Sequence, residues 1–229
     1  MIKTDELPVR RRSWVQVAGL PKARMGWELS DCKEITNNDM SLAKAWIDKV
    51  RDGSVIRAEG KKTCGKGLLL VGEPGHGKTT FALAIIQEMI RTFPLDAFSV
   101  ESNKALVTPC YFATFNDIID LKGALMGEHT DEQERLFLGM HGECADDAYN
   151  IRVLVIDDIG KEHTSGTGWQ RAMLHHLLRT RFNNGLPTII TTNLAVDAWD
   201  AAYGNATESF IREAFAIIEL QSTKGDLRR

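Results

Sequence analysis

Short apolar runs alternate with longer amphipathic stretches along this chain of 229 residues. Runs of five residues or fewer, at 68–71, 110–114, 153–156 and 188–192, predict strands. The continuous apolar run at 153–156 is typical of a strand buried on both faces of a parallel sheet. Stretches with apolar side chains three and four residues apart predict helices, and they lie at about 37–53, 81–93, 116–125, 127–150 and 169–182. The pattern predicts an α/β fold with a mostly parallel sheet flanked by helices.

The first 35 residues carry scattered apolar positions without a sustained period. We therefore expect an irregular basic N-terminal arm at 1–35, followed by one domain at 36–229. Arg10, Arg11, Arg12 and Trp14 have the composition of a nucleic-acid contact, and they equally suit a solvated tail.

The strand at 68–71 runs into a glycine-rich turn that matches the P-loop pattern G-x-x-x-x-G-K-[ST]. Glycines in such a turn let backbone N–H groups point at phosphate oxygens, while the lysine supplies charge and the threonine hydroxyl binds Mg²⁺. The apolar face of the following helix supplies the context that this motif requires. The sequence thus predicts a nucleotide site formed by Gly72, Glu73, Pro74, Gly75, His76, Gly77, Lys78, Thr79 and Thr80.

A second acidic motif ends the strand at 153–156, where Asp157 and Asp158 follow directly. Open α/β sheets bind ligands at the carboxyl ends of their strands, so these carboxylates are expected near the P-loop. Asp157, with Thr79, would hold Mg²⁺, and Asp158 would orient the attacking water, with Glu162 sharing that task. Asn193 ends the strand at 188–192, where it either polarises the water or closes an Asx turn.

Composition narrows the class of protein. The chain is 43% hydrophobic and 26% charged, as in ordinary globular domains, and no apolar run is long enough to span a membrane. No signal-peptide pattern opens the chain and its four cysteines form no C-x-x-C pair, so we expect a reduced, cytoplasmic protein. Residues 1–66 hold 14 Lys and Arg against 9 Asp and Glu, a charge of +5 within a chain whose net charge is −3. This basic segment could meet nucleic acid or simply be solvated.

Three motifs in this order carry a family resemblance, namely 72–79, Ile156-Asp157-Asp158-Ile159-Gly160 and Pro187-Thr-Ile-Ile-Thr-Thr-Asn193-Leu. The chain resembles the AAA+ ATPases of the DnaC/DnaI helicase-loader and IstB transposition-helper family, over roughly residues 60–228. The resemblance implies an AAA+ core with little or no separate lid domain, and ATP and Mg²⁺ as cofactors.

The resemblance also implies that ATP lies between neighbouring subunits of a homo-oligomeric ring or spiral. It implies an arginine finger, for which Arg212 is the candidate, because it is the only arginine between Arg181 and Arg228. Arg228, in a Gly-Asp-Leu-Arg ending, resembles the family's sensor-2 arginine. Arg181 matches an arginine that reaches an adjacent subunit, and the segment 93–107 corresponds to a single-stranded DNA contact.

The expected function is ATP-dependent loading of a DnaB-type replicative helicase onto single-stranded DNA. Two alternatives remain open at this stage. An IstB-like helper would use the same ATPase on duplex DNA. A nucleotide-gated adaptor would bind ATP with negligible turnover, in keeping with Asp158, which is one methylene shorter than the glutamate often found in its role.

Overall fold

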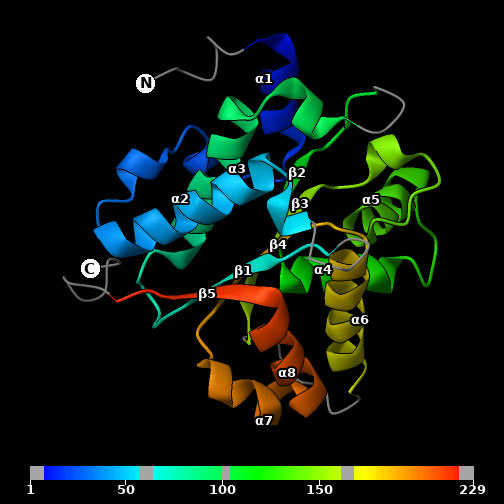
Figure 1. The fold of residues 1–229 in the computed structure, drawn as a ribbon. Coiled ribbons are helices and arrows are strands. Elements are labelled where there is room, and N and C mark those ends of the chain that lie inside the picture. Colours follow the sequence, from blue (N-terminus) through cyan, green and yellow to red (C-terminus); the bar gives the residue numbers. More distant parts are fainter. Residues whose placement is uncertain (1–7, 57–63, 100–103, 161–167, 222–229) are drawn as a thin grey trace.

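A computed structural model describes residues 8–56, 64–99, 104–160 and 168–221 of the chain (Figure 1). Its centre is a five-stranded sheet in the order β2-β3-β4-β1-β5. Every pairing in the sheet is parallel. The strands are β1 Gly67–Val71, β2 Cys110–Thr114, β3 Val153–Ile159, β4 Thr188–Thr192 and β5 Phe215–Glu219. The predicted α/β class with a parallel sheet is confirmed.

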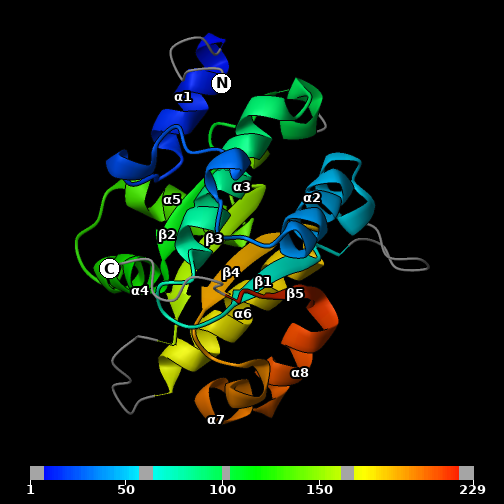
Figure 2. The ribbon, with the colours of Figure 1, turned by 90° about the vertical axis from the view of Figure 1, so that its left-hand side faces the viewer.

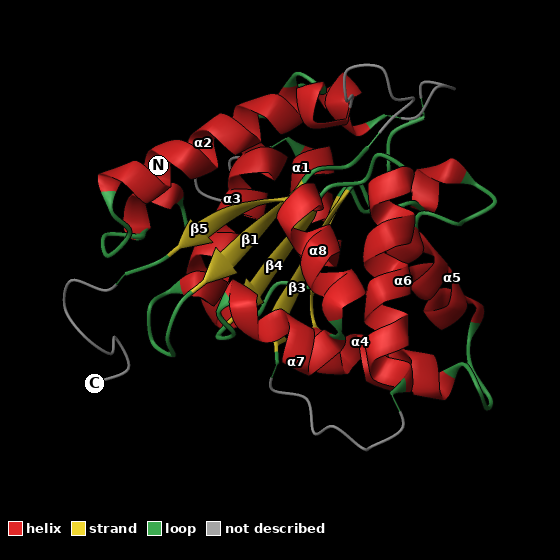
Figure 3. Cartoon of the chain, turned by 60° about the horizontal axis from the view of Figure 1, so that its bottom comes forward, coloured by secondary structure: helices red, strands yellow, loops and turns green. Residues whose placement is uncertain are grey.

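Helices cover both faces of the sheet (Figure 3). One face carries α1 Val9–Val17, α2 Asn37–Arg51 and α3 Lys78–Thr92, and the other carries α4 Phe115–Ala124, α5 Asp131–His141, α6 Trp169–Asn183, α7 Trp199–Tyr203 and α8 Asn205–Ala214. Side chains on a strand alternate between faces, so Leu68 and Leu70 join the first core while Leu69 and Val71 join the second. Short 3₁₀ helices lie at Lys22–Arg24, Leu29–Asp31, Ser54–Ile56, Leu95–Phe98, Asp147–Tyr149 and Val196–Ala198.

The N-terminal segment differs from the predicted irregular arm. Residues 9–17 form the helix α1, on the same side of the sheet as α3 (Figure 2). Trp14 is only 2% exposed, and its indole N–H donates to the carbonyl oxygen of Leu106 at 2.9 Å. The Arg11 guanidinium donates to the carbonyl oxygens of Ile90 and Phe93, just where α3 ends. The prediction of irregular structure is therefore wrong for this helix. Trp14 is a core residue, and its ring is too buried to stack on a nucleic-acid base.

Arg181 on α6 also differs from the expectation, which had it reaching an adjacent subunit. Its side chain is fully buried, and its guanidinium donates to the Thr188 hydroxyl and to four carbonyl oxygens, those of Met140, Ile151, Arg152 and Pro187. Burial lowers the pKa of Arg181 to about 9, which leaves it charged at neutral pH. Arg181 therefore ties α5, β3 and β4 together inside one chain, and the expected contact with a neighbour is wrong.

The cysteines and the apolar character of the helices are two further features of the fold. Three of the cysteines are buried, Cys144 is half-buried, and all four are free thiols. Within the described ranges, no helix combines the length and the apolar character that crossing a bilayer demands.

Candidate nucleotide site

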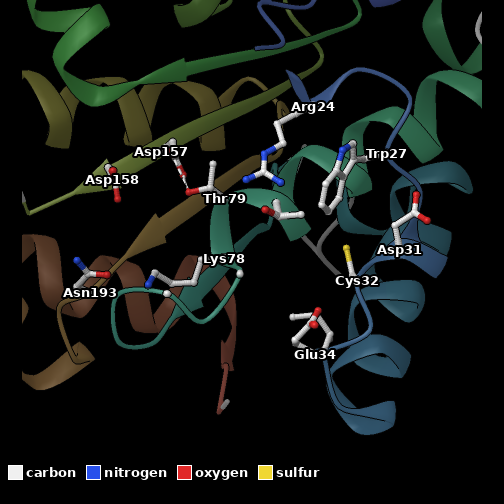
Figure 4. Close-up of a pocket in the computed structure, with 14 residues that line it drawn as sticks. Arg24, Trp27, Asp31, Cys32, Glu34, Lys78, Thr79, Asp157, Asp158 and Asn193 are labelled. Carbon is white, nitrogen blue, oxygen red and sulfur yellow. Dashed lines mark hydrogen bonds between the residues drawn. The ribbon is translucent and has the colours of Figure 1, made fainter. Parts of the chain in front are cut away.

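Three neighbouring strands, β1, β4 and β3, end at the same edge of the sheet and carry the predicted motifs there. A cavity of about 500 Å³ opens at this edge (Figure 4). We call it the P-loop cavity. Its lining includes Gly75, Gly77, Lys78, Thr79, Thr80, Asp157, Asp158 and Asn193. The fold therefore brings the two motifs and the end of β4 to one place, as the strand pattern predicted.

The turn between β1 and α3 has the backbone form that a phosphate cradle requires. Gly75 and Gly77 have φ angles of 88° and 76°, in the left-handed region that favours glycine. Gly77 is the N-cap of α3, so the first N–H groups of this helix face the turn. A helix start with unsatisfied N–H groups binds anions through hydrogen bonds and the helix dipole.

The far side of this turn is fastened to the end of β5. A Cβ on Gly72 would lie 2.8 Å from the carbonyl oxygen of Leu220, so only glycine fits there. His76 Nδ1 lies 3.1 Å from that same oxygen. Since a carbonyl only accepts, His76 carries its proton on Nδ1 and donates it. The predicted site residues Gly72 and His76 thus hold the loop in place from outside the cavity lining.

Lys78 is 6% exposed, and its ammonium is folded back over the loop. Nζ donates to the carbonyl oxygens of Gly72 and Glu73, each at 2.8 Å. Two carbonyl dipoles orient the ammonium without neutralising its charge, so it can attract phosphate oxygens at the cavity.

Thr79 and Asp157 meet across the cavity as the sequence predicted. The Thr79 hydroxyl donates to Asp157 Oδ1 at 2.9 Å, and Oδ2 is 3.1 Å from the same hydroxyl. The Thr191 hydroxyl, from β4, donates to Oδ1 at 2.5 Å. A hydroxyl beside a buried carboxylate is a donor set that Mg²⁺ accepts, since the ion prefers oxygen ligands and uses few protein groups. Thr79 and Asp157 are therefore suitable ligands for Mg²⁺. Thr191, which was not among the predicted site residues, orients the carboxylate of Asp157.

Asp158 has an unusual backbone. Its φ angle is 61°, and it is the only residue other than glycine among those described with a positive φ. The register of β3 against β4 shifts between Ile156 and Ile159, so Asp158 sits in a bulge. Its N–H donates to the Thr191 hydroxyl at 3.0 Å, which fastens the bulge to β4. Strained backbone of this kind costs about 1–3 kcal/mol and collects at functional sites. Here it turns the Asp158 side chain to the cavity.

Asn193 completes this wall of the cavity. Its Oδ1 is buried and has no hydrogen-bond partner within the described ranges. Buried polar atoms are nearly always satisfied, so an oxygen of this kind calls for a ligand or a water. The polarising role of Asn193 stays a prediction.

The remaining predicted residues lie elsewhere. Arg212, on α8, does not line the cavity, and its guanidinium forms ion pairs with Glu208 at 2.8 Å and with Asp197. Glu73 and Pro74 also lie outside the lining, although the Glu73 carbonyl holds Lys78. Glu162 and Arg228 lie outside the described residues.

The wall opposite the P-loop was not predicted. It comes from the segment before α2 and consists of Arg24, Trp27, Asp31, Cys32, Glu34 and Ile35. Burial, with Asp31 and Glu34 nearby, raises the pKa of the Cys32 thiol to about 12, so Cys32 lines the cavity as a neutral thiol. The segment therefore lines the same cavity as the P-loop.

Comparison with known proteins places this geometry in a family. The family described as "ATPase family associated with various cellular activities (AAA)" matches residues 68–213, nearly two thirds of the chain. The chain belongs to this family. Membership of this AAA family implies that the chain binds a nucleotide. No curated protein matches the chain by sequence.

Three solved structures illustrate what this AAA protein is similar to. The DnaC helicase loader is 27% identical, with a TM-score of 0.56, over 88% of this chain and 100% of that one. DnaI is 19% identical, with a TM-score of 0.59, over 94% and 99% of the two chains. The replication initiator DnaA bound to AMPPCP and single-stranded DNA is 13% identical, with a TM-score of 0.54, over 84% and 48%. At these identities the last two show the shared fold alone.

Proposed function

We propose that this protein loads a DnaB-type replicative helicase onto single-stranded DNA, using the binding and hydrolysis of ATP. The observation that carries the proposal is the 27% identity to the DnaC helicase loader over the whole of that chain. The carboxylates and hydroxyls at the P-loop cavity add the groups that ATP hydrolysis needs.

ATP binding follows from the P-loop. The N–H groups at the start of α3 and the Lys78 ammonium would hold the β- and γ-phosphates, because both bring positive charge to the same end of the cavity. Thr79 and Asp157 would hold Mg²⁺, which when bound would supply positive charge that offsets the charge of the phosphates.

Hydrolysis would depend on Asp158 and Asn193. The Asp158 carboxylate would accept a hydrogen bond from the attacking water, and the Asn193 amide would fix the water's position from the next strand. Because Asp158 is one methylene shorter than glutamate, its reach is shorter, and we expect slow turnover. An Asp158→Ala variant should bind ATP like the wild type and hydrolyse it at least about a hundredfold more slowly.

The active assembly would be a homo-oligomer. Arg212 is half-exposed on α8 and outside its own cavity, a position from which it could serve a neighbour's γ-phosphate. Its two carboxylate partners would orient the side chain until that contact forms. Under this proposal Arg212→Ala leaves ATP affinity unchanged and removes the rise of specific ATPase activity with protein concentration. A concentration dependence kept by Arg212→Ala would contradict this role.

The DNA step can be tested by fluorescence anisotropy. Labelled single-stranded and double-stranded oligonucleotides are titrated with protein at fixed salt, with and without ATP, because phosphate contacts make affinity strongly salt-dependent. Lys78→Ala serves as the control. If the protein is a helicase loader, we expect it to bind DNA in an ATP-dependent way, to favour single strands, and to lose this binding in Lys78→Ala. The second step is co-elution of a purified DnaB-type helicase with the ATP-bound protein.

Other results would contradict the proposed loading function. A preference for duplex DNA would indicate a helper that acts on duplexes, as in transposition. If Asp158→Ala still captures the helicase and loads it as well as the wild type does, the result would indicate an adaptor that does not need ATP turnover.

A further inference from the structure

The P-loop cavity contains a second cation besides Lys78. It is Arg24, which comes from the wall opposite the P-loop. The charged residues of the lining are two cations, Lys78 and Arg24, and four carboxylates, Asp31, Glu34, Asp157 and Asp158. An unbalanced excess of carboxylates would repel a polyphosphate, so each cation matters for its binding.

The backbone that carries Arg24 is anchored to the P-loop helix. Gln87 of α3 is 1% exposed, and its side-chain amide donates to the Arg24 carbonyl oxygen at 3.0 Å and accepts from the Gly26 N–H at 2.7 Å. One turn further along α3, Arg91 forms an ion pair with Glu28 at 3.0 Å. A buried polar contact and an ion pair therefore fix this segment to the helix that begins at the phosphate site.

The Arg24 side chain is placed by Trp27. Its guanidinium lies over the indole ring, with the central carbon 4.6 Å from the ring centroid. Stacking uses the flat face of a guanidinium and leaves the N–H donors at its edge available. Across the described part of the chain, no carboxylate forms an ion pair with Arg24. Figure 4 shows the guanidinium between Trp27 and Thr79, and all three residues line the cavity.

We propose that Arg24 binds the phosphates of the nucleotide within its own subunit, as a second cation beside Lys78. The inference rests on the proposed ATP site. A guanidinium binds phosphate through paired N–H···O bonds, and hydrogen bonds between charged groups are about twice as strong as neutral ones. Because Gln87 and Arg91 fix the same segment to α3, Arg24 is already held beside the P-loop before the nucleotide binds.

The test separates charge from packing. Arg24→Met keeps a long apolar side chain for the Trp27 ring and removes the charge, whereas Arg24→Lys keeps the charge. The matched control is Arg135→Met, because Arg135 also stacks on an aromatic ring, that of Tyr149 at 4.7 Å, but does not line the cavity. Calorimetry measures the affinity of each full-length variant for ATP, ADP and adenosine in the presence of Mg²⁺.

We expect Arg24→Met to weaken ATP binding about tenfold or more, with adenosine affinity unchanged. Arg24→Lys should recover part of the loss, and Arg135→Met should match the wild type. Wild-type ATP affinity in Arg24→Met, or an equal loss for ATP and adenosine, would overturn the inference while leaving the proposed function intact. A wild-type protein that binds no ATP would overturn both.

Discussion

The replacement Thr191→Val tests how β4 positions the two neighbouring residues Asp157 and Asp158, which line the P-loop cavity. The Thr191 side chain is fully buried, and valine has nearly the same shape without the hydroxyl. That hydroxyl donates to Asp157 Oδ1 and accepts the N–H of Asp158. The variant therefore removes one bond to a charged group and leaves one N–H without its partner.

Two contributions set the expected loss of stability. A hydrogen bond to a charged group is worth about 1.5–3 kcal/mol, and an unsatisfied buried N–H costs about 1–3 kcal/mol. The added methyl group recovers less than about 1 kcal/mol. We expect the free energy of unfolding, measured in urea, to fall by about 2–5 kcal/mol. Because Asp157 also loses its orientation, the variant should need about tenfold more Mg²⁺ for half-maximal ATP binding.

Thr192 supplies the control for this experiment. It is also fully buried, and its hydroxyl donates to the Ile159 carbonyl at 2.8 Å and accepts the Leu194 N–H at 3.0 Å. Thr192→Val should therefore lose somewhat less stability, because its acceptor is a neutral carbonyl, and it should show no change in Mg²⁺ requirement. Thr191→Ser should restore both properties. An identical Mg²⁺ requirement in Thr191→Val and the wild type would refute the positioning role of this hydroxyl.

Three other variants follow from the same contacts. Asp158→Gly should raise the free energy of unfolding by about 1 kcal/mol in urea, since glycine adopts φ 61° without strain, while ATP hydrolysis is lost. Arg181→Met should lower it by about 3 kcal/mol, because several buried carbonyl groups lose their donor, and unchanged stability would contradict the internal role. Trp27→Phe should remove the ATP-induced change of tryptophan fluorescence, since Trp27 is the one tryptophan in the lining, and a change that persists would argue against this wall.

Local patterns predicted four of the five strands and the P-loop. The strands at 110–114 and 188–192 begin and end where the sequence placed them, because turn-forming residues bound their apolar runs. The P-loop was recognisable since its glycines, lysine and threonine act together over eight residues. Asp157 could be assigned with it because parallel strands end at one edge of the sheet.

Other features depend on contacts between distant segments, which no local pattern reveals. The helix α1 lacks a regular apolar stripe, and its place is set by contacts with Leu106 and with the end of α3. Arg24 and Trp27 reach the cavity because Gln87 and Arg91 of α3 bind their segment. The role of Thr191 arises from the bulge in β3, which turns the Asp158 N–H toward β4.

The most direct test of the account is the rate of ATP hydrolysis by the wild type, compared with Lys78→Ala and Asp158→Ala, with and without single-stranded DNA. Parallel calorimetry measures ATP binding by each protein. We expect the wild type to bind ATP and hydrolyse it slowly, Lys78→Ala to do neither, and Asp158→Ala to bind ATP without hydrolysing it. Equal ATP binding by the wild type and Lys78→Ala would contradict the assignment of the P-loop cavity as the ATP site.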